Sequence, residues 1–101
     1  MKLVLLTAVA DFKKDIKEIL RKSEVKSYSY KDVIGFKNAS ADAMGSNWFG
    51  TEMTENESVF FYAFVPHEKV DFLFTLCNAF NAQQDTQSHI HVAVINIEQS
   101  N

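Results

Sequence analysis

The sequence predicts an α+β domain in which a four-stranded antiparallel sheet carries two helices on one of its faces. Two observations predict this class. Four segments are apolar or alternate between apolar and polar residues as strands do, and two segments have the periodicity of amphipathic helices. A chain of 101 residues, 47% of them hydrophobic, also has the size and composition of one globular unit. We therefore expect a single domain over residues 1–101.

The first strand and the first helix lie at the N-terminal end. Residues 2–9 form a short apolar segment, which predicts a strand. From Phe12 to Leu20 the apolar residues recur every three or four positions, with charged residues between them, and this pattern predicts an amphipathic helix. Asp11 stands just before it and is the expected N-cap.

The middle of the chain predicts two strands separated by a long loop. Apolar and polar residues alternate over residues 27–37, which is typical of a strand. Residues 38–58 are rich in Asn, Ser, Ala and Thr and show no period, so a long loop is expected there, with Trp48 and Phe49 in its middle. Residues 59–65 are apolar on both sides and predict the third strand.

The last two elements are a helix and a strand. Pro66 ends the third strand and can open a helix, which is expected over residues 67–83. A polar segment follows, and residues 89–98 predict the final strand. The order strand, helix, strand, strand, helix, strand is that of the ferredoxin-like βαββαβ fold.

The strand pattern also predicts association between chains. Two helices cover only one face of a four-stranded sheet, yet the first, third and fourth strands are apolar on both faces. A large exposed apolar face is rare in monomers, so we expect a homo-oligomer whose sheets pack together. The alternative is that the long loop folds back over the open face.

Composition excludes several classes of function. The net charge of −3 argues against nucleic-acid binding, and no apolar run is long enough for direct membrane insertion. The apolar start is too short for a signal peptide, so we expect a cytoplasmic protein. Cys77 lies on an apolar helical stripe and is expected to be a buried hydrophobe. Without a catalytic constellation, the chain is not expected to be an enzyme.

Two features carry possible binding chemistry. His89 and His91 are two apart in a predicted strand and would share one face, which begins a divalent-metal site. A third ligand would come from the loop, from His67 or from another subunit, so a trimeric metal-binding or metal-tolerance protein is one hypothesis. Trp48 and Phe49 would anchor a protein partner, or else cover the sheet or fill a groove between subunits.

Three stretches in order carry a family resemblance. Phe12-Lys13 with Ile16–Leu20, Asp32–Phe36 before a long loop, and Val65-Pro66 before a helix are arranged as in the PII-like signalling proteins. The sequence therefore resembles that superfamily, as a divergent member. The resemblance implies a homotrimer with sheets facing inward, and a regulator that binds a small ligand in the cleft between subunits.

The resemblance also implies the site and its output. The ligand would lie between the base of the long loop, known in the family as the T-loop, and the segment before the last strand. These positions are Gly35, Phe36, Lys37, Asn38, Ser88 and His89. Lys37 stands where nucleotide-binding members carry a second glycine, and residues 83–88 lack their glycines. The expected ligand is thus a nucleotide, a small anion or a divalent metal, and the expected partner is a regulated protein such as a membrane transporter.

Overall fold

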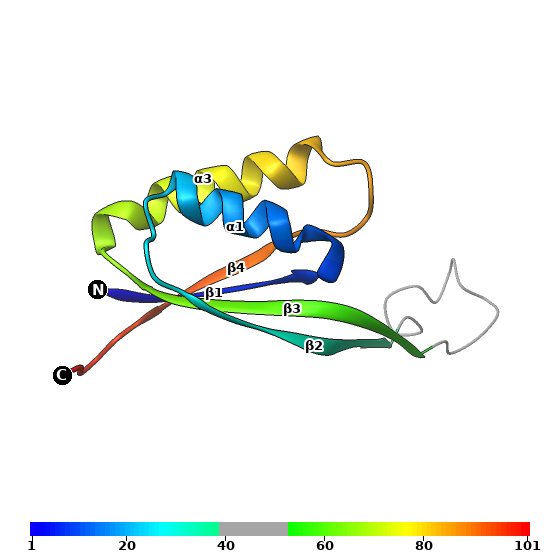
Figure 1. Ribbon diagram of the computed structural model, residues 1–101, viewed down its shortest axis with the longest axis horizontal. Coiled ribbons are helices and arrows are strands. Elements are labelled where there is room, and N and C mark those ends of the chain that lie inside the picture. Colours follow the sequence, from blue (N-terminus) through cyan, green and yellow to red (C-terminus); the bar gives the residue numbers. More distant parts are fainter. Residues whose placement is uncertain (39–52) are drawn as a thin grey trace.

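A four-stranded antiparallel sheet carries two helices on one face (Figure 1). The computed structural model describes residues 1–38 and 53–101. The strands, in the spatial order β2-β3-β1-β4, are β1 (Lys2–Val9), β2 (Ser29–Asn38), β3 (Met53–Val65) and β4 (His91–Asn96). The helical elements are η1 (Ala10–Phe12), α1 (Lys13–Lys22) and α3 (His67–Gln83). The α+β class and the ferredoxin-like arrangement predicted from the sequence are therefore confirmed.

Several predicted boundaries differ from the observed ones. β1 and α3 have the predicted bounds, but β4 begins at His91, so His89 precedes the strand. Asp11 is not the N-cap of α1. It lies within the 3-10 turn η1, and Phe12 occupies the cap position without a side-chain hydrogen bond. The extra turn carries the chain from the end of β1 onto the helical layer.

The loop predicted over residues 38–58 is shorter, because both of its ends belong to strands. Asn38 pairs with Met53 and Phe36 pairs with Glu55, so β2 and β3 continue as a two-stranded ribbon beyond the helices (Figure 1). A two-stranded ribbon needs no apolar alternation where both of its faces meet solvent, so the composition of residues 53–58 predicts no strand. Residues 39–52, including Trp48 and Phe49, lie outside the described residues.

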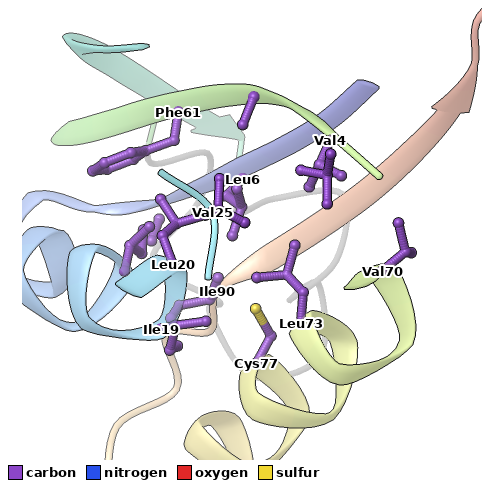
Figure 2. Close-up of a cluster of buried hydrophobic side chains, with 14 of the residues drawn as sticks. Val4, Leu6, Ile19, Leu20, Val25, Phe61, Val70, Leu73, Cys77 and Ile90 are labelled. Carbon is purple, nitrogen blue, oxygen red and sulfur yellow. The ribbon is translucent and has the colours of Figure 1, made fainter. Parts of the chain in front are cut away.

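The hydrophobic core lies between the sheet and the helices (Figure 2). Val4 and Leu6 of β1 and Phe61 of β3 point into it and are fully buried. Leu20 of α1 and Leu73 of α3 close the core from the helical side and are also fully buried. Each such side chain contributes about 1.5–3 kcal/mol through burial, so this layer stabilises the fold.

The end of α1 is closed by a Schellman motif on a non-glycine residue. The Val25 N–H donates to the Leu20 carbonyl and the Glu24 N–H to the Arg21 carbonyl, both at 3.0 Å. Glu24 has φ of 61°, in the left-handed region that glycine adopts without steric cost. The contact between buried Val25 and Leu20 supports this turn at the expense of backbone strain at Glu24.

Replacing Glu24 with Gly should raise the free energy of unfolding by about 0.5–1 kcal/mol, because glycine relieves the left-handed strain. The loss of the exposed ion pair between Glu24 and Lys69, 3.7 Å long, offsets little of this gain. Urea denaturation measures the change. Lys22→Gly, at the last position of α1 and two residues before Glu24, is the control and should destabilise the protein by a similar amount. A loss of stability in Glu24→Gly would contradict the assignment of strain.

The other face of the sheet, here called the open face, is apolar and uncovered. No element within residues 1–38 and 53–101 lies over it (Figure 1). Phe64 is 55% exposed, Ile95 44% and Tyr62 40%. Register places further apolar residues on the same face: Leu3, Leu5, Phe60 and Ala93. The prediction that the central strands are apolar on both faces is confirmed, and the open face is an apolar patch of the kind that marks an interface.

Candidate functional site

The two groups of predicted ligand residues lie toward the same end of the sheet but at opposite edges. Gly35 lies in the edge strand β2 and pairs with Asn56 of β3. His91 opens the other edge strand, β4, and pairs with Thr7 of β1. Three strand spacings separate these edges, which is about 14 Å at the usual 4.8 Å per strand. A single chain therefore does not bring Gly35 and His89 together.

The first group lies at the base of the β2–β3 ribbon. Gly35 and Phe36 are neighbours in β2, so they lie on opposite faces of the ribbon. The Phe36 side chain is 60% exposed. Lys37 and Asn38 continue β2 opposite Thr54 and Met53. A hollow of about 340 Å³ lies beside this base and is lined by Ala10, Lys13, Asp32, Val33, Ile34, Glu57 and Ser58.

An ion pair crosses from the helical layer to this hollow. Lys13 Nζ lies 2.7 Å from Asp32 Oδ1, and the hydrogen bond that Lys13 donates to this carboxylate raises the pKa of the Lys13 amine. Glu57, across the ribbon from Ile34, adds a second carboxylate to the same lining. The hollow thus offers one cation held by its own carboxylate, so an anion bound at the ribbon base would need a further positive group.

Gly35 lies against the side chain of Ser58 on the neighbouring strand. A Cβ atom at this position would lie 2.6 Å from the Ser58 hydroxyl, well inside contact distance. The Ser58 hydroxyl donates a long hydrogen bond of 3.4 Å to the Asn56 carbonyl. The glycine therefore lets the Ser58 side chain lie across the ribbon base.

Replacing Gly35 with Ala should lower the free energy of unfolding by about 1 kcal/mol, because the Ser58 hydroxyl must move aside. The double variant Gly35→Ala/Ser58→Ala should regain wild-type stability or exceed it, since alanine loses less backbone entropy than glycine in a strand. Chemical denaturation of both variants, with Ser58→Ala as the control, measures this coupling. Equal losses in the single and double variants would show that the hydroxyl is not the obstacle.

The second group lies in the segment that joins α3 to β4, and side-chain amides organise this segment. Asn81 donates to the Ile90 carbonyl at 2.9 Å and accepts from the Ile90 N–H at 2.7 Å. The Gln84 amide donates to the carbonyls of Thr86 and Ser88, and its oxygen accepts from the Thr86 N–H at 2.8 Å. The segment thus has a defined shape without glycine. Sequence reasoning missed Asn81 and Gln84, and only their polarity near the end of α3 hinted at them.

The histidines do not form the strand pair that was predicted. His89 precedes β4, next to the buried Ile90, and both His89 and His91 are exposed. His67 begins α3 at the opposite end of the sheet, where Val65 pairs with Lys2, so it cannot complete their site. Residues 1–38 and 53–101 contain no group of three side chains able to hold a metal ion. A metal site would need a ligand from another chain or from residues 39–52.

Cys77 is unsuited to nucleophilic chemistry. It is fully buried on α3 among the core residues, and burial raises the pKa of its thiol to about 11. The thiol is therefore protonated at neutral pH. The prediction that Cys77 is a small buried hydrophobe is confirmed.

None of the described helices is long and apolar enough to cross a membrane. The longest, α3, has 17 residues and carries charged groups in its first two turns.

Comparison of the structure with solved structures identifies the fold. GlnK of B. subtilis, solved as a complex with ATP, matches with a TM-score of 0.66 and 18% identity over 93% of this chain and 80% of its own. CPII of Thiomonas intermedia K12, a nitrogen regulatory PII-like protein solved with ADP, AMP and bicarbonate, matches with a TM-score of 0.59. It is 19% identical over 97% of this chain and 94% of its own. No family model matches the sequence, and no curated protein matches it significantly. The chain therefore has the fold of the nitrogen regulatory PII-like proteins, as its sequence resemblance predicted.

Proposed function

We propose that this chain is a non-enzymatic PII-like regulator that works as a homotrimer in the cytoplasm. A small ligand binds between subunits and changes the affinity of the protein for a regulated partner. The observation that carries the proposal is the division of the candidate site. Gly35 and His89 lie toward one end of the sheet but at its two opposite edges, in a chain whose open face is apolar and uncovered.

Assembly through the open face explains both the separation of Gly35 from His89 and the uncovered apolar face. Three chains with their sheets turned inward would bury Tyr62, Phe64 and Ile95, which one chain leaves exposed. The β2 edge of one chain would then approach the β4 edge of its neighbour. The ligand site would combine Gly35, Phe36, Lys37 and Asn38 of one chain with Ser88 and His89 of the next.

A nucleotide is the ligand that the comparisons favour. ATP is named in the GlnK structure, and ADP, AMP and bicarbonate in the CPII structure. In the sequence Lys37 is a basic residue of β2, and His89 lies exposed beside the segment organised by Gln84. Both suit an anionic group, while the lack of glycine in residues 83–88 removes the close backbone approach that phosphates use elsewhere.

In this proposal, ligand binding changes the affinity for the partner through the segment that joins β2 to β3. The ligand must bind one arrangement of this segment more tightly than another in order to shift its population. Trp48 and Phe49 within it are then presented to a protein partner, for which we propose a membrane transporter or another regulated protein.

A thermal-shift panel of ATP, ADP, AMP and bicarbonate against Zn²⁺, Cu²⁺ and Ni²⁺ tests the ligand class. At 100 times its dissociation constant, a ligand should stabilise the protein by about 2.7 kcal/mol. A shift with a nucleotide supports the regulator. A shift with a metal that is lost in His89→Ala/His91→Ala supports the metal-binding alternative, for which a neighbouring chain would supply the missing ligand.

Mixed oligomers test the composite site more sharply. Gly35→Val impairs one half of the site and Ser88→Ala/His89→Ala impairs the other. If two chains share each site, random trimers from a 1:1 mixture regain about one quarter of the wild-type sites, since one pairing in four joins two intact halves. Calorimetric titration with ATP counts these sites. Recovery of no sites, with each variant still trimeric, would place the ligand within one chain.

A further inference from the structure

A groove on the helical side of the molecule concentrates the positive charge of the chain. Its lining comes from α1, from the connection between α1 and β2, and from the first turn of α3. The groove, here called the α1 groove, measures about 790 Å³, within the usual range for small-molecule sites. Its lining residues are Lys14, Lys17, Glu18, Arg21, Glu24, Val25, Lys26, Tyr28 and Lys69. Five of the ten Lys and Arg residues of an acidic chain thus surround one hollow.

Both carboxylates in this lining are already neutralised. The Arg21 guanidinium donates to both oxygens of Glu18, at 2.7 and 2.6 Å. Lys69 Nζ lies 3.7 Å from Glu24 and donates to the Glu24 carbonyl at 3.2 Å. Within residues 1–38 and 53–101, Lys14 and Lys26 form no ion pair. The field inside the groove is therefore positive, although the whole chain carries −3.

Several walls of the groove are fixed before any ligand arrives. Lys17 Nζ lies 4.5 Å from the centre of the Tyr30 ring and donates to its hydroxyl at 3.2 Å. The left-handed residue Glu24 and the hydrogen bonds of its turn hold the connection against α1. Cations held in place by their own chain lose less entropy when they bind an anion.

The floor of the groove is apolar. Val25 is buried, and the half-buried ring of Tyr28 packs 5.6 Å from Phe61, centre to centre. An inorganic ion would gain nothing from this floor, whereas an organic group lying on Val25 and Tyr28 would exclude water from it. Charge at the rim and an apolar floor together define an amphipathic anion as the occupant.

We propose that the α1 groove is a ligand site complete within one chain. It binds an organic molecule that carries two or more negative charges beside a flat apolar group. The site is separate from the intersubunit cleft, because Tyr28 precedes the start of β2 while Gly35 lies six residues beyond Ser29, about 20 Å along the strand. A chain of this kind would respond to two ligands, one between subunits and one on each helical face.

The test uses 1-naphthyl phosphate as probe and inorganic phosphate as its counterpart without the apolar group. Titration into ¹⁵N-labelled protein should shift the amide signals of residues 24–28 and 69, and naphthyl phosphate should bind more tightly than phosphate. Lys14→Gln and Lys26→Gln should each weaken naphthyl phosphate about fivefold. Lys22→Gln is the matched control, since Lys22 lies on the same helix outside the groove, and it should change the affinity less than about twofold.

Three results would overturn the proposal. Equal weakening by Lys14→Gln and Lys22→Gln would mean that the probe responds only to the overall charge. Shifts confined to residues 35–36 and 88–91 would place the probe in the intersubunit cleft. Equal affinity for phosphate and naphthyl phosphate would show that the Val25 and Tyr28 floor contributes nothing.

Discussion

Replacing Phe64 with Glu should separate the protein into single chains without unfolding it. Phe64 lies on the open face and is 55% exposed in one chain, so a charged residue there costs a lone subunit little. In an assembly that covers this face, the same residue loses the burial of a phenylalanine, worth about 1.5–3 kcal/mol in each subunit, and leaves a carboxylate buried without a partner. Sedimentation velocity at micromolar concentration measures the change in mass, and circular dichroism monitors the fold.

Phe72→Glu is the matched control for this experiment. Phe72 is 51% exposed but lies on α3, in the helical layer on the other side of the molecule. It should leave the mass unchanged, because the proposed trimer turns its helices outward. A wild-type protein that sediments as a single chain, or equal effects of both variants, would contradict assembly through the open face.

Replacing Phe61 with Ala should lower the free energy of unfolding by about 3–5 kcal/mol, the usual cost of truncating a large buried aromatic residue. Phe61 is fully buried at the centre of the sheet, where its ring stacks 5.0 Å from Tyr30 and lies 5.6 Å from Tyr28. Both contacts connect β3 to β2 and to the segment before it. The loss is comparable with the whole stability of many small domains, so the variant should be largely unfolded near 37 °C.

Urea denaturation at 25 °C gives the size of the Phe61 effect. Phe72→Ala removes the same atoms from a half-exposed site and should cost less than about 1 kcal/mol. If both variants lost the same stability, Phe61 would not have the central place in the core that its burial indicates.

The elements that sequence reasoning located best are those with a one-sided or two-sided apolar pattern. β1 and α3 have the predicted bounds because each presents a row of apolar residues to the core, such as Val4 and Leu6 in β1 and Val70 and Leu73 in α3. The ribbon formed by residues 53–58 with β2 was missed, because its pairing is set by hydrogen bonds between backbones and not by side chains. The position of Asp11 was predicted wrongly for a similar reason. The 3-10 turn that contains it has no buried residues, so no apolar pattern indicates it.

The candidate site could be predicted only in part. Gly35 and Phe36 lie at the ribbon base. Which edge of the sheet they and His89 occupy depends on the order of the strands, and no local sequence pattern determines that order. The amides of Asn81 and Gln84 act on residues up to nine positions away, through contacts that form only once α3 and β4 are in place. The α1 groove could not be predicted either, because it forms only when the chain folds and brings Lys69 of α3 next to α1.

The paired ribbon of β2 and β3 limits how a signal can travel along it. Sliding one strand by a single residue would turn every side chain of that strand to the opposite face, taking Ile34 and Phe36 with it. Sliding by two residues would keep the faces but displace the strand by about 6.6 Å and break every backbone hydrogen bond on the way. A ligand bound at the ribbon base, as we propose, would therefore act by changing the twist and bend of the paired strands, and the backbone pairing sets how stiff the ribbon is.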